Sequence, residues 1–152
     1  MIDITGKAAT QRSATARGRV LLNEAAREAL REGRLPKGDA VEVARIAGIM
    51  AAKKCAELVP YCHQIPLQHV TVAVSPTDAG VEITATARAE ASTGVEMEAL
   101  TAVTVAALTI FDMCKALDKG IEIREVMLQR KTGGKSGDYN RQAQGATRKA
   151  KG

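Results

Sequence analysis

Aromatic side chains are almost absent from this 152-residue chain, which contains one Phe, two Tyr and no Trp. Hydrophobic residues still make up 45% of the sequence, and this excludes a chain that is disordered throughout. The core must therefore be built from Ala, Val, Leu, Ile and Met. A surface that binds RNA by stacking bases on aromatic rings has almost no side chains to draw on.

Cysteine pairs and long apolar runs are also missing. The three cysteines, Cys55, Cys62 and Cys114, lie far apart in the sequence and form no CxxC motif. We therefore expect reduced thiols rather than a disulfide framework, and neither a zinc site nor another metal site. The longest apolar run, within residues 99–111, is broken by threonines, and the opening MIDITGK does not resemble a signal peptide. These absences predict a cytoplasmic protein without a membrane span.

The net charge of +5 is concentrated at the C-terminal end of the chain. Residues 140–152 include Arg141, Arg148, Lys149 and Lys151 but no acidic residue, which leaves residues 1–139 nearly neutral. We interpret residues 1–139 as a single domain and residues 140–152 as a basic, disordered tail. The alternative is a small basic RNA-binding protein, which would use the tail and the GGKSG stretch to bind phosphates.

Hydrophobic periodicity predicts most of the secondary structure. Asn23 and Asp39 are suitable N-caps for two helices, and the turn TDAG joins two segments of alternating polarity as in a β-hairpin. The predicted elements are helices over residues 24–32, 39–58 and 94–117, and strands over residues 69–75, 81–89 and 121–128. Residues 1–7 are either a strand or an arm, and residues 12–22 remain ambiguous. This order predicts an α+β fold with long helices on one face of an antiparallel sheet.

The stretch KTGGKSGDY, from Lys131 to Tyr139, resembles a phosphate-binding loop but does not match a P-loop. That motif requires a glycine five positions before Gly134, where this chain has Gln129, and a helix directly after the loop. The glycines still allow several backbone N–H groups to face one anion, with Lys131 adding charge. A flexible hinge before the tail explains the same residues equally well.

Three other stretches carry side chains suited to chemistry. Lys37 precedes a helix N-terminus, where anions are favoured, although it can also be a solvated charge beside the Asp39 cap. The prolines around Tyr61, Cys62 and His63 hold an imidazole in a loop, where acid–base or hydrogen-bonding roles suit it better than metal binding. 

Asp112 and Lys115 are three residues apart on a helix that is largely apolar, so we expect them to share a buried face. Such a pair is either a structural ion pair or an acid–base pair with shifted pKa values.

Five segments together resemble the molybdenum cofactor biosynthesis protein C family, the cyclic pyranopterin monophosphate synthases. They are KGD at Lys37, ARIAGIMAAKK, the Cys62-His63 loop, TGVEMEALTAVTVAALTIFDMCKA and KTGGKSGDY. They occur in the order typical of the family and extend from Ile2 to about Tyr139. The combination of TGVEMEAL, DMCKA and GGKSGD is highly specific to this family.

The resemblance implies a ferredoxin-like α+β subunit in a homohexamer, a trimer of dimers with active sites at subunit interfaces. It implies an enzyme without a cofactor that converts 3',8-cyclo-7,8-dihydro-GTP, made by a radical SAM enzyme, to cyclic pyranopterin monophosphate and diphosphate. It implies no nucleic-acid or membrane partner. The implied catalytic residues are Asp112 and Lys115. The implied substrate pocket contains Arg12, Lys37, Tyr61, Cys62, His63, Glu96, Met97, Glu98 and Lys131.

The spacing of Glu98 and Asp112 disfavours a pocket that uses both residues directly within a single subunit. Fourteen residues of helix separate them by about 21 Å along its axis, and almost four full turns place them on similar faces. A two-fold axis that sets two copies of this helix antiparallel would bring Glu98 of one subunit near Asp112 of the other. The sequence therefore favours a shared site. A family member that has lost catalysis and acts as an oligomeric scaffold is disfavoured by the presence of both Asp112 and Lys115.

Overall fold

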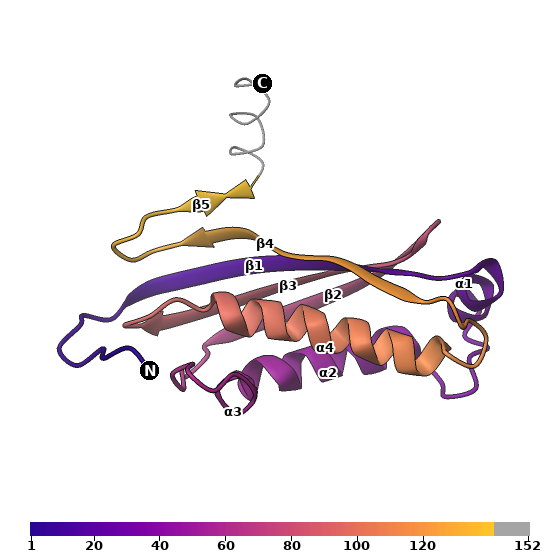
Figure 1. Ribbon diagram of the computed structural model, residues 1–152, viewed down its shortest axis with the longest axis horizontal. Helices are drawn as coiled ribbons and strands as arrows, with labels where there is room; N and C mark the ends of the chain where they lie inside the picture. Colours follow the sequence, from indigo (N-terminus) through magenta and orange to yellow (C-terminus); the bar gives the residue numbers. More distant parts are fainter. Residues whose placement is uncertain (142–152) are drawn as a thin grey trace, which may run out of the picture.

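The computed structural model describes residues 1–141 and consists of one antiparallel sheet with its long helices on one face (Figure 1). The strands are β1 (Thr10–Leu21), β2 (His69–Thr77), β3 (Gly80–Ala91), β4 (Glu122–Thr132) and β5 (Tyr139–Asn140), and the helices are α1 (Glu24–Arg31), α2 (Ala40–Lys53), α3 (Cys55–Leu58) and α4 (Glu96–Cys114). In the sheet the strands follow the order β2-β3-β1-β4-β5. The predicted α+β class is confirmed.

Strand β1 lies at the centre of the sheet, although its sequence did not distinguish strand from helix. It pairs with β3 along its whole length and with β4 on its other side. Ala14, Ala16 and Val20 face the helices and are buried, while Thr15 points to the open face and shares a 2.8 Å hydrogen bond with Thr86 of β3. Two neighbouring strands thus determine a conformation that the small residues of β1 leave undecided.

Small residues bring α2 and α4 close together and close to the sheet. A Cβ atom added at Gly48 of α2 would lie 2.9 Å from the carbonyl oxygen of Ala102 in α4, so no larger residue fits there. On α4, Ala99, Ala102 and Ala106 are fully buried. Alanine and glycine replace the missing aromatic residues in this core by allowing the backbones to approach closely.

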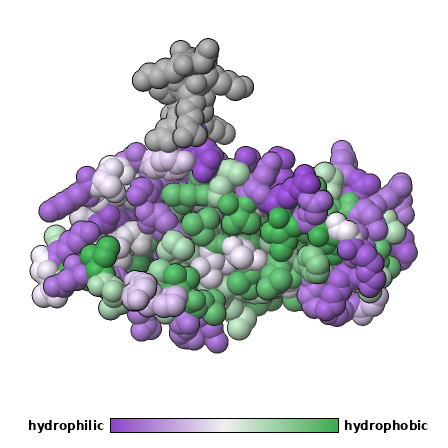
Figure 2. Space-filling view, viewed as in Figure 1, coloured by the Kyte–Doolittle hydropathy of each residue, from purple (hydrophilic) through white to green (hydrophobic). Residues whose placement is uncertain are grey.

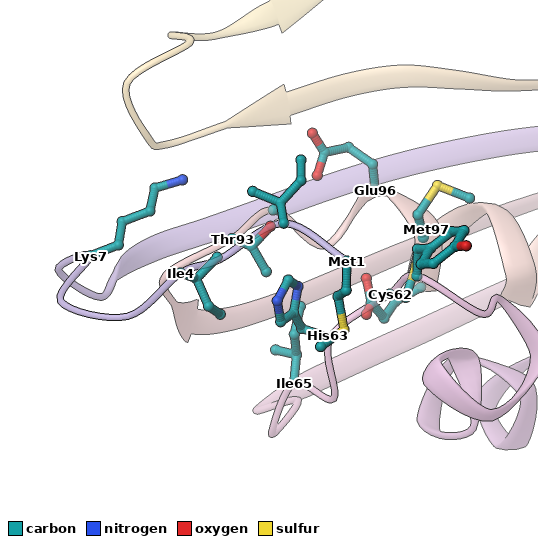
Figure 3. Close-up of a pocket in the computed structure, with 13 residues that line it drawn as sticks. Met1, Ile4, Lys7, Cys62, His63, Ile65, Thr93, Glu96 and Met97 are labelled. Carbon is teal, nitrogen blue, oxygen red and sulfur yellow. The ribbon is translucent and has the colours of Figure 1, made fainter.

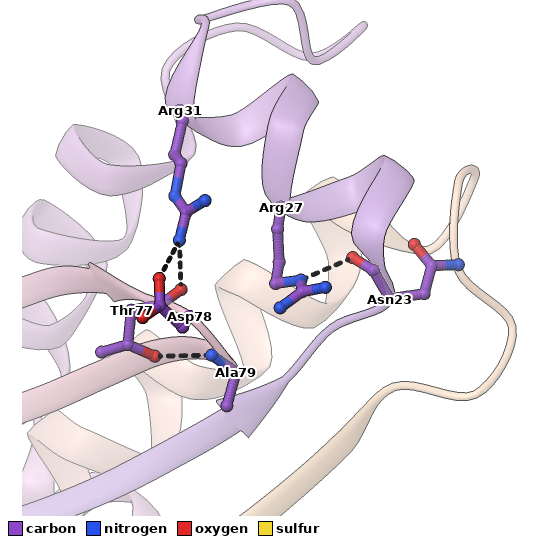
Figure 4. A network of polar contacts seen from close by, with 6 residues as sticks. All are labelled: Asn23, Arg27, Arg31, Thr77, Asp78 and Ala79. Atoms are coloured by element: carbon purple, nitrogen blue, oxygen red, sulfur yellow. Dashed lines mark hydrogen bonds and ion pairs between the residues drawn. The ribbon is translucent and has the colours of Figure 1, made fainter.

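The turn between β2 and β3 is anchored to α1 by Arg31 (Figure 4). The Arg31 guanidinium donates to the Thr77 carbonyl at 2.8 Å and to the Asp78 carboxylate at 3.1 Å. The Ala79 N–H donates to the Thr77 hydroxyl at 3.3 Å within the same turn. These bonds fix the end of the sheet where Asn23, as predicted, caps α1 by accepting from Ala26 N.

The other helix and strand predictions are correct in type, with small differences in extent. The helix predicted over residues 39–58 is capped by Asp39 but is interrupted at Lys54, which separates α2 from α3. The strand predicted over residues 121–128 corresponds to β4, which continues to Thr132, beyond the predicted end. Residues 1–7 form an arm without regular structure. Residues 142–152, most of the predicted basic tail, lie outside the described part of the chain.

The outer faces of α2 and α4 leave large apolar side chains exposed. Val43, Ile46 and Met50 on α2 and Leu108 on α4 are each at least 43% exposed. Figure 2 shows hydrophobic surface gathered over the helical layer. By length and composition α4 would be sufficient to cross a membrane, but half of that segment is buried and it packs against β1 and α2, as a core helix does.

Candidate active site

A cavity of about 680 Å³ opens at the N-terminal end of α4 (Figure 3). The N-terminal arm, the loop that follows α3 and the first turn of α4 form its walls, and these three segments meet at one end of the molecule (Figure 1). Six of the predicted pocket residues line it: Tyr61, Cys62, His63, Glu96, Met97 and Glu98. The structure therefore brings together two stretches that are more than thirty residues apart in the sequence.

Glu98 is a buried carboxyl group in the wall of this cavity. Its side chain is 3% exposed, and its Oε2 atom has no hydrogen-bond partner among the described residues. Burial raises the pKa of Glu98, and the neighbouring charge of Glu96 raises it further. A carboxyl group that retains its proton above the usual pH range is suited to donate that proton to a bound substrate.

The raised pKa of Glu98 predicts a stability change in Glu98→Gln. The unfolded chain ionises Glu98 at a lower pH than the folded chain does, so wild-type stability falls as the pH rises above the unfolded value. Glutamine removes this cost. We expect the melting temperature of Glu98→Gln to exceed that of wild type by about 3 °C at pH 8, and the difference to shrink towards pH 4. 

Differential scanning fluorimetry across this pH range tests the prediction, with the exposed Glu57→Gln as a matched control. A variant that is less stable than wild type at pH 8 would show that the Glu98 carboxylate makes a stabilising contact.

A second cavity, of about 340 Å³, adjoins the first and is basic. Lys7 and Glu96 line both cavities, and Arg12, Lys131 and Lys135 contribute further positive charge to the second. Lys131 Nζ lies 2.9 Å from Glu96 Oε1 and 3.4 Å from Ser136 Oγ. The arrangement supplies several cations and several hydroxyl-bearing residues to a single concave surface, which is the chemistry that binds phosphate.

The glycine-rich stretch folds over the side chain of Arg12. Gly133 and Gly134 have φ angles of 94° and 82°, a conformation that other residues rarely adopt. A Cβ atom at Gly134 would clash with the Arg12 guanidinium, which is 8% exposed and donates to the Ala91 carbonyl at 3.3 Å. The glycines are therefore needed for the backbone to pass close to a buried cation. This geometry favours the anion-binding interpretation of the stretch over the hinge.

Asp112 forms a separate cluster at the opposite end of α4. Its carboxylate lies 2.5 Å from Lys37 Nζ and 2.7 Å from Lys115 Nζ. Hydrogen bonds from Lys115 and Lys37 lower the pKa of Asp112 to about 2. The expectation that Asp112 and Lys115 share a buried face is wrong, because both side chains are about half exposed in the subunit. The apolar residues around them belong to the uncovered outer face of the helical layer.

The predicted site residues thus form two groups in one subunit. Arg12, Tyr61, Cys62, His63, Glu96, Met97, Glu98 and Lys131 surround the two cavities, whereas Lys37, Asp112 and Lys115 lie at the far end of α4. The N-terminal arm also forms a wall of the larger cavity, with Ile4 and Lys7 among its contributors, and this was not predicted. Gly6, directly before Lys7, is consistent with a turn in the arm, but no local motif indicates where an arm folds back. Residues 1–141 contain no group of three His, Cys, Asp or Glu side chains placed to hold a metal ion.

Comparison with known proteins decides the family. The model of the MoaC family matches residues 1–134, which is most of the chain and includes both groups of site residues. The chain belongs to the MoaC family. The resemblance inferred from its motifs is confirmed.

Relatives of this MoaC-family chain are similar over nearly its whole length. A protein of Chloroflexus aurantiacus is 53% identical over 143 residues, covering 93% of this chain and 88% of the relative. One from Streptomyces coelicolor is 55% identical over 141 residues, covering 93% and 83%, and one from a Nostoc species is 52% identical over 141 residues, covering 91% and 84%. All three are named cyclic pyranopterin monophosphate synthase.

Proposed function

We propose that this chain is a cyclic pyranopterin monophosphate synthase of molybdenum cofactor biosynthesis. The observation that carries the proposal is its identity of more than 50% to several proteins of that name, over more than nine-tenths of its length. The reaction converts 3',8-cyclo-7,8-dihydro-GTP to cyclic pyranopterin monophosphate and releases diphosphate. We place the enzyme in the cytoplasm, where a radical SAM enzyme supplies its substrate.

The two adjoining cavities suit the two parts of this substrate. The triphosphate carries several negative charges, and the basic cavity offers Arg12, Lys131 and Lys135 to neutralise them. The ring system fits the larger cavity, whose lining is mainly apolar and includes His63 and Glu98. Lys7 and Glu96 lie where the two cavities join, beside the ribose of a substrate bound in this orientation.

Opening and closing the ring system requires several proton transfers, and the two groups of residues supply complementary partners. Asp112, with a pKa of about 2, is ionised at neutral pH and can accept a proton or hold the Lys115 ammonium in position. Burial raises the pKa of Glu98, so this carboxyl group keeps its proton to a higher pH and can donate it. Each correctly placed acid or base accelerates a step by roughly 10²–10⁴.

A complete site requires a second subunit in this proposal. Asp112 lies about 21 Å along α4 from Glu98, and Lys115 and Lys37 lie beside Asp112. A two-fold axis across the apolar outer faces of α2 and α4 would bury that surface and place the Asp112 group of one subunit at the cavities of its partner. We propose that three such dimers assemble into a hexamer.

The direct test of the function uses purified protein and enzymatically prepared 3',8-cyclo-7,8-dihydro-GTP. We expect chromatography to detect the pyranopterin product and an enzyme-coupled assay to detect an equal amount of diphosphate. Substrate that remains intact with folded wild-type protein would overturn the proposed function.

Removal of Lys131 should weaken substrate capture far more than it affects folding. The residue lies on β4 at the start of the glycine-rich stretch, and its ammonium group makes a partly exposed ion pair with Glu96 and a long hydrogen bond to Ser136. A charge-assisted hydrogen bond to phosphate contributes about 1.5–3 kcal/mol, so we expect Lys131→Ala to raise the KM by about 10–100-fold. Steady-state kinetics and thermal melts measure the two effects.

Arg19→Ala is the control, since Arg19 also makes partly exposed ion pairs, with Glu82 and Glu125, but lines neither cavity. Early melting with a normal KM would support the hinge interpretation instead.

A further inference from the structure

Cys55 and Cys62 are brought together by two consecutive turns at the end of α3. The Val59 N–H donates to the Cys55 carbonyl at 2.9 Å, and the Cys62 N–H donates to the Val59 carbonyl at 3.0 Å. These turns fold the chain back, and Cys62 lies close enough to Cys55 to contribute to the raised pKa of its thiol. Their separation of seven residues matches no familiar dithiol motif, so the sequence alone does not indicate the pair.

The two thiols differ in their access to the cavity. Cys62 is partly exposed and lines the larger cavity (Figure 3). Cys55 is buried behind it, with its sulfur 3.5 Å from the Thr101 hydroxyl of α4. The third cysteine, Cys114, is buried near the far end of α4. Burial raises the pKa of Cys55 and of Cys114 to about 11, so both remain protonated at neutral pH and are poor first targets for an oxidant.

We propose that Cys62 and Cys55 form a reversible disulfide modification site in the wall of the cavity, with a hydroperoxide as the oxidant. The Cys62 sulfur attacks one peroxide oxygen and the O–O bond breaks, which gives a sulfenic acid and, with hydrogen peroxide, one water. The Cys55 sulfur then attacks the Cys62 sulfur, and the S–O bond breaks. The hydroxyl group leaves with the Cys55 proton as a second water. Two electrons from the two thiols reduce the peroxide.

The new bond would alter the substrate-binding surface. A disulfide holds its sulfur atoms about 2.05 Å apart, so Cys62 must move towards Cys55 and away from the cavity. His63 follows Cys62 directly and lines the same cavity, so its imidazole moves as well. The oxidised enzyme is therefore inactive and regains activity on reduction. This effect on turnover rests on the proposed function, whereas formation of the disulfide does not.

Peptide mapping tests the modification without reference to activity. Purified protein is treated with hydrogen peroxide, then unfolded in guanidinium chloride with N-ethylmaleimide present so that buried free thiols are labelled, and digested. Trypsin releases both cysteines in one peptide, residues 55–88, because no Lys or Arg lies between Lys54 and Arg88. We expect this peptide to be unlabelled and about 2 Da lighter than its reduced form, while Cys114 is labelled. Cleavage after Glu57 should then give two fragments that separate only after reduction.

Variants and turnover complete the test. In Cys55→Ser, the Cys62 sulfenic acid has no resolving thiol and should be trapped by dimedone, whereas Cys114→Ser should form the disulfide as wild type does. Oxidised wild type should lose at least about 90% of its turnover and recover it with dithiothreitol.

Labelling of all three thiols after peroxide treatment, or disulfides only between subunits, would overturn the modification site. A linked peptide with unchanged turnover would overturn its effect on the cavity. Absence of turnover before oxidation would count against the proposed function, and the peptide masses would still decide the disulfide.

Discussion

Replacement of Asp112 by asparagine is expected to abolish turnover while leaving the subunit folded and assembled. The carboxylate lies between the Lys37 and Lys115 ammonium groups and is held ionised by them, with a pKa of about 2. Asparagine keeps the size of the side chain but neither accepts a proton nor balances the two cations. We expect turnover to fall by at least about 10³-fold, within the range seen when an acid–base group is removed.

The fold should tolerate this change because the lost ion pairs are half exposed and solvent screens them. Size-exclusion chromatography and thermal melts measure assembly and stability, and substrate binding should persist in part because Arg12 and Lys131 are untouched. Asp78→Asn is a matched control, since Asp78 is likewise an exposed aspartate in an ion pair, in its case with Arg31. Near-normal turnover in Asp112→Asn would remove Asp112 from the mechanism.

The fold was largely predictable because its caps and alternating segments are local features. Asn23 and Asp39 accept hydrogen bonds from Ala26 N and Glu42 N, as their positions before apolar periodic segments indicated. Strand β1 was not predictable in this way. Its alanines, serine and threonines fit either conformation, and its pairing with β3 and β4 depends on residues more than fifty positions away. 

The candidate site residues were proposed from motifs, but their environments were not predictable from one subunit's sequence. Asp112 was expected to be buried because its helix is apolar, yet it lies on a face of α4 that nothing covers in the subunit. An apolar helix face indicates burial without saying whether its own chain or another copy provides the cover. Lys7 was missed for a related reason, because only tertiary folding of the arm brings it to the cavities.

Glu98→Gln and Asp112→Asn subunits should each be inactive alone and should regain activity when combined. The larger cavity contains Glu98 and lacks Asp112, which lies about 21 Å away along the same helix. If a partner supplies Asp112, a mixed dimer has one site with both carboxylates and another site that carries both substitutions. By counting random pairs, an equal mixture should recover about a quarter of wild-type activity, and purified mixed dimers about half.

Subunits must be unfolded and refolded together for this test, because a large apolar interface exchanges slowly. Two distinguishable affinity tags allow mixed dimers to be purified, and native mass spectrometry confirms their composition. A refolded mixture of Glu98→Gln with untagged Glu98→Gln controls for recovery caused by refolding itself. Confirmed mixed dimers without activity would mean that each site draws Glu98 and Asp112 from one chain. That outcome would require the two ends of a nineteen-residue helix to reach one substrate, which its length argues against.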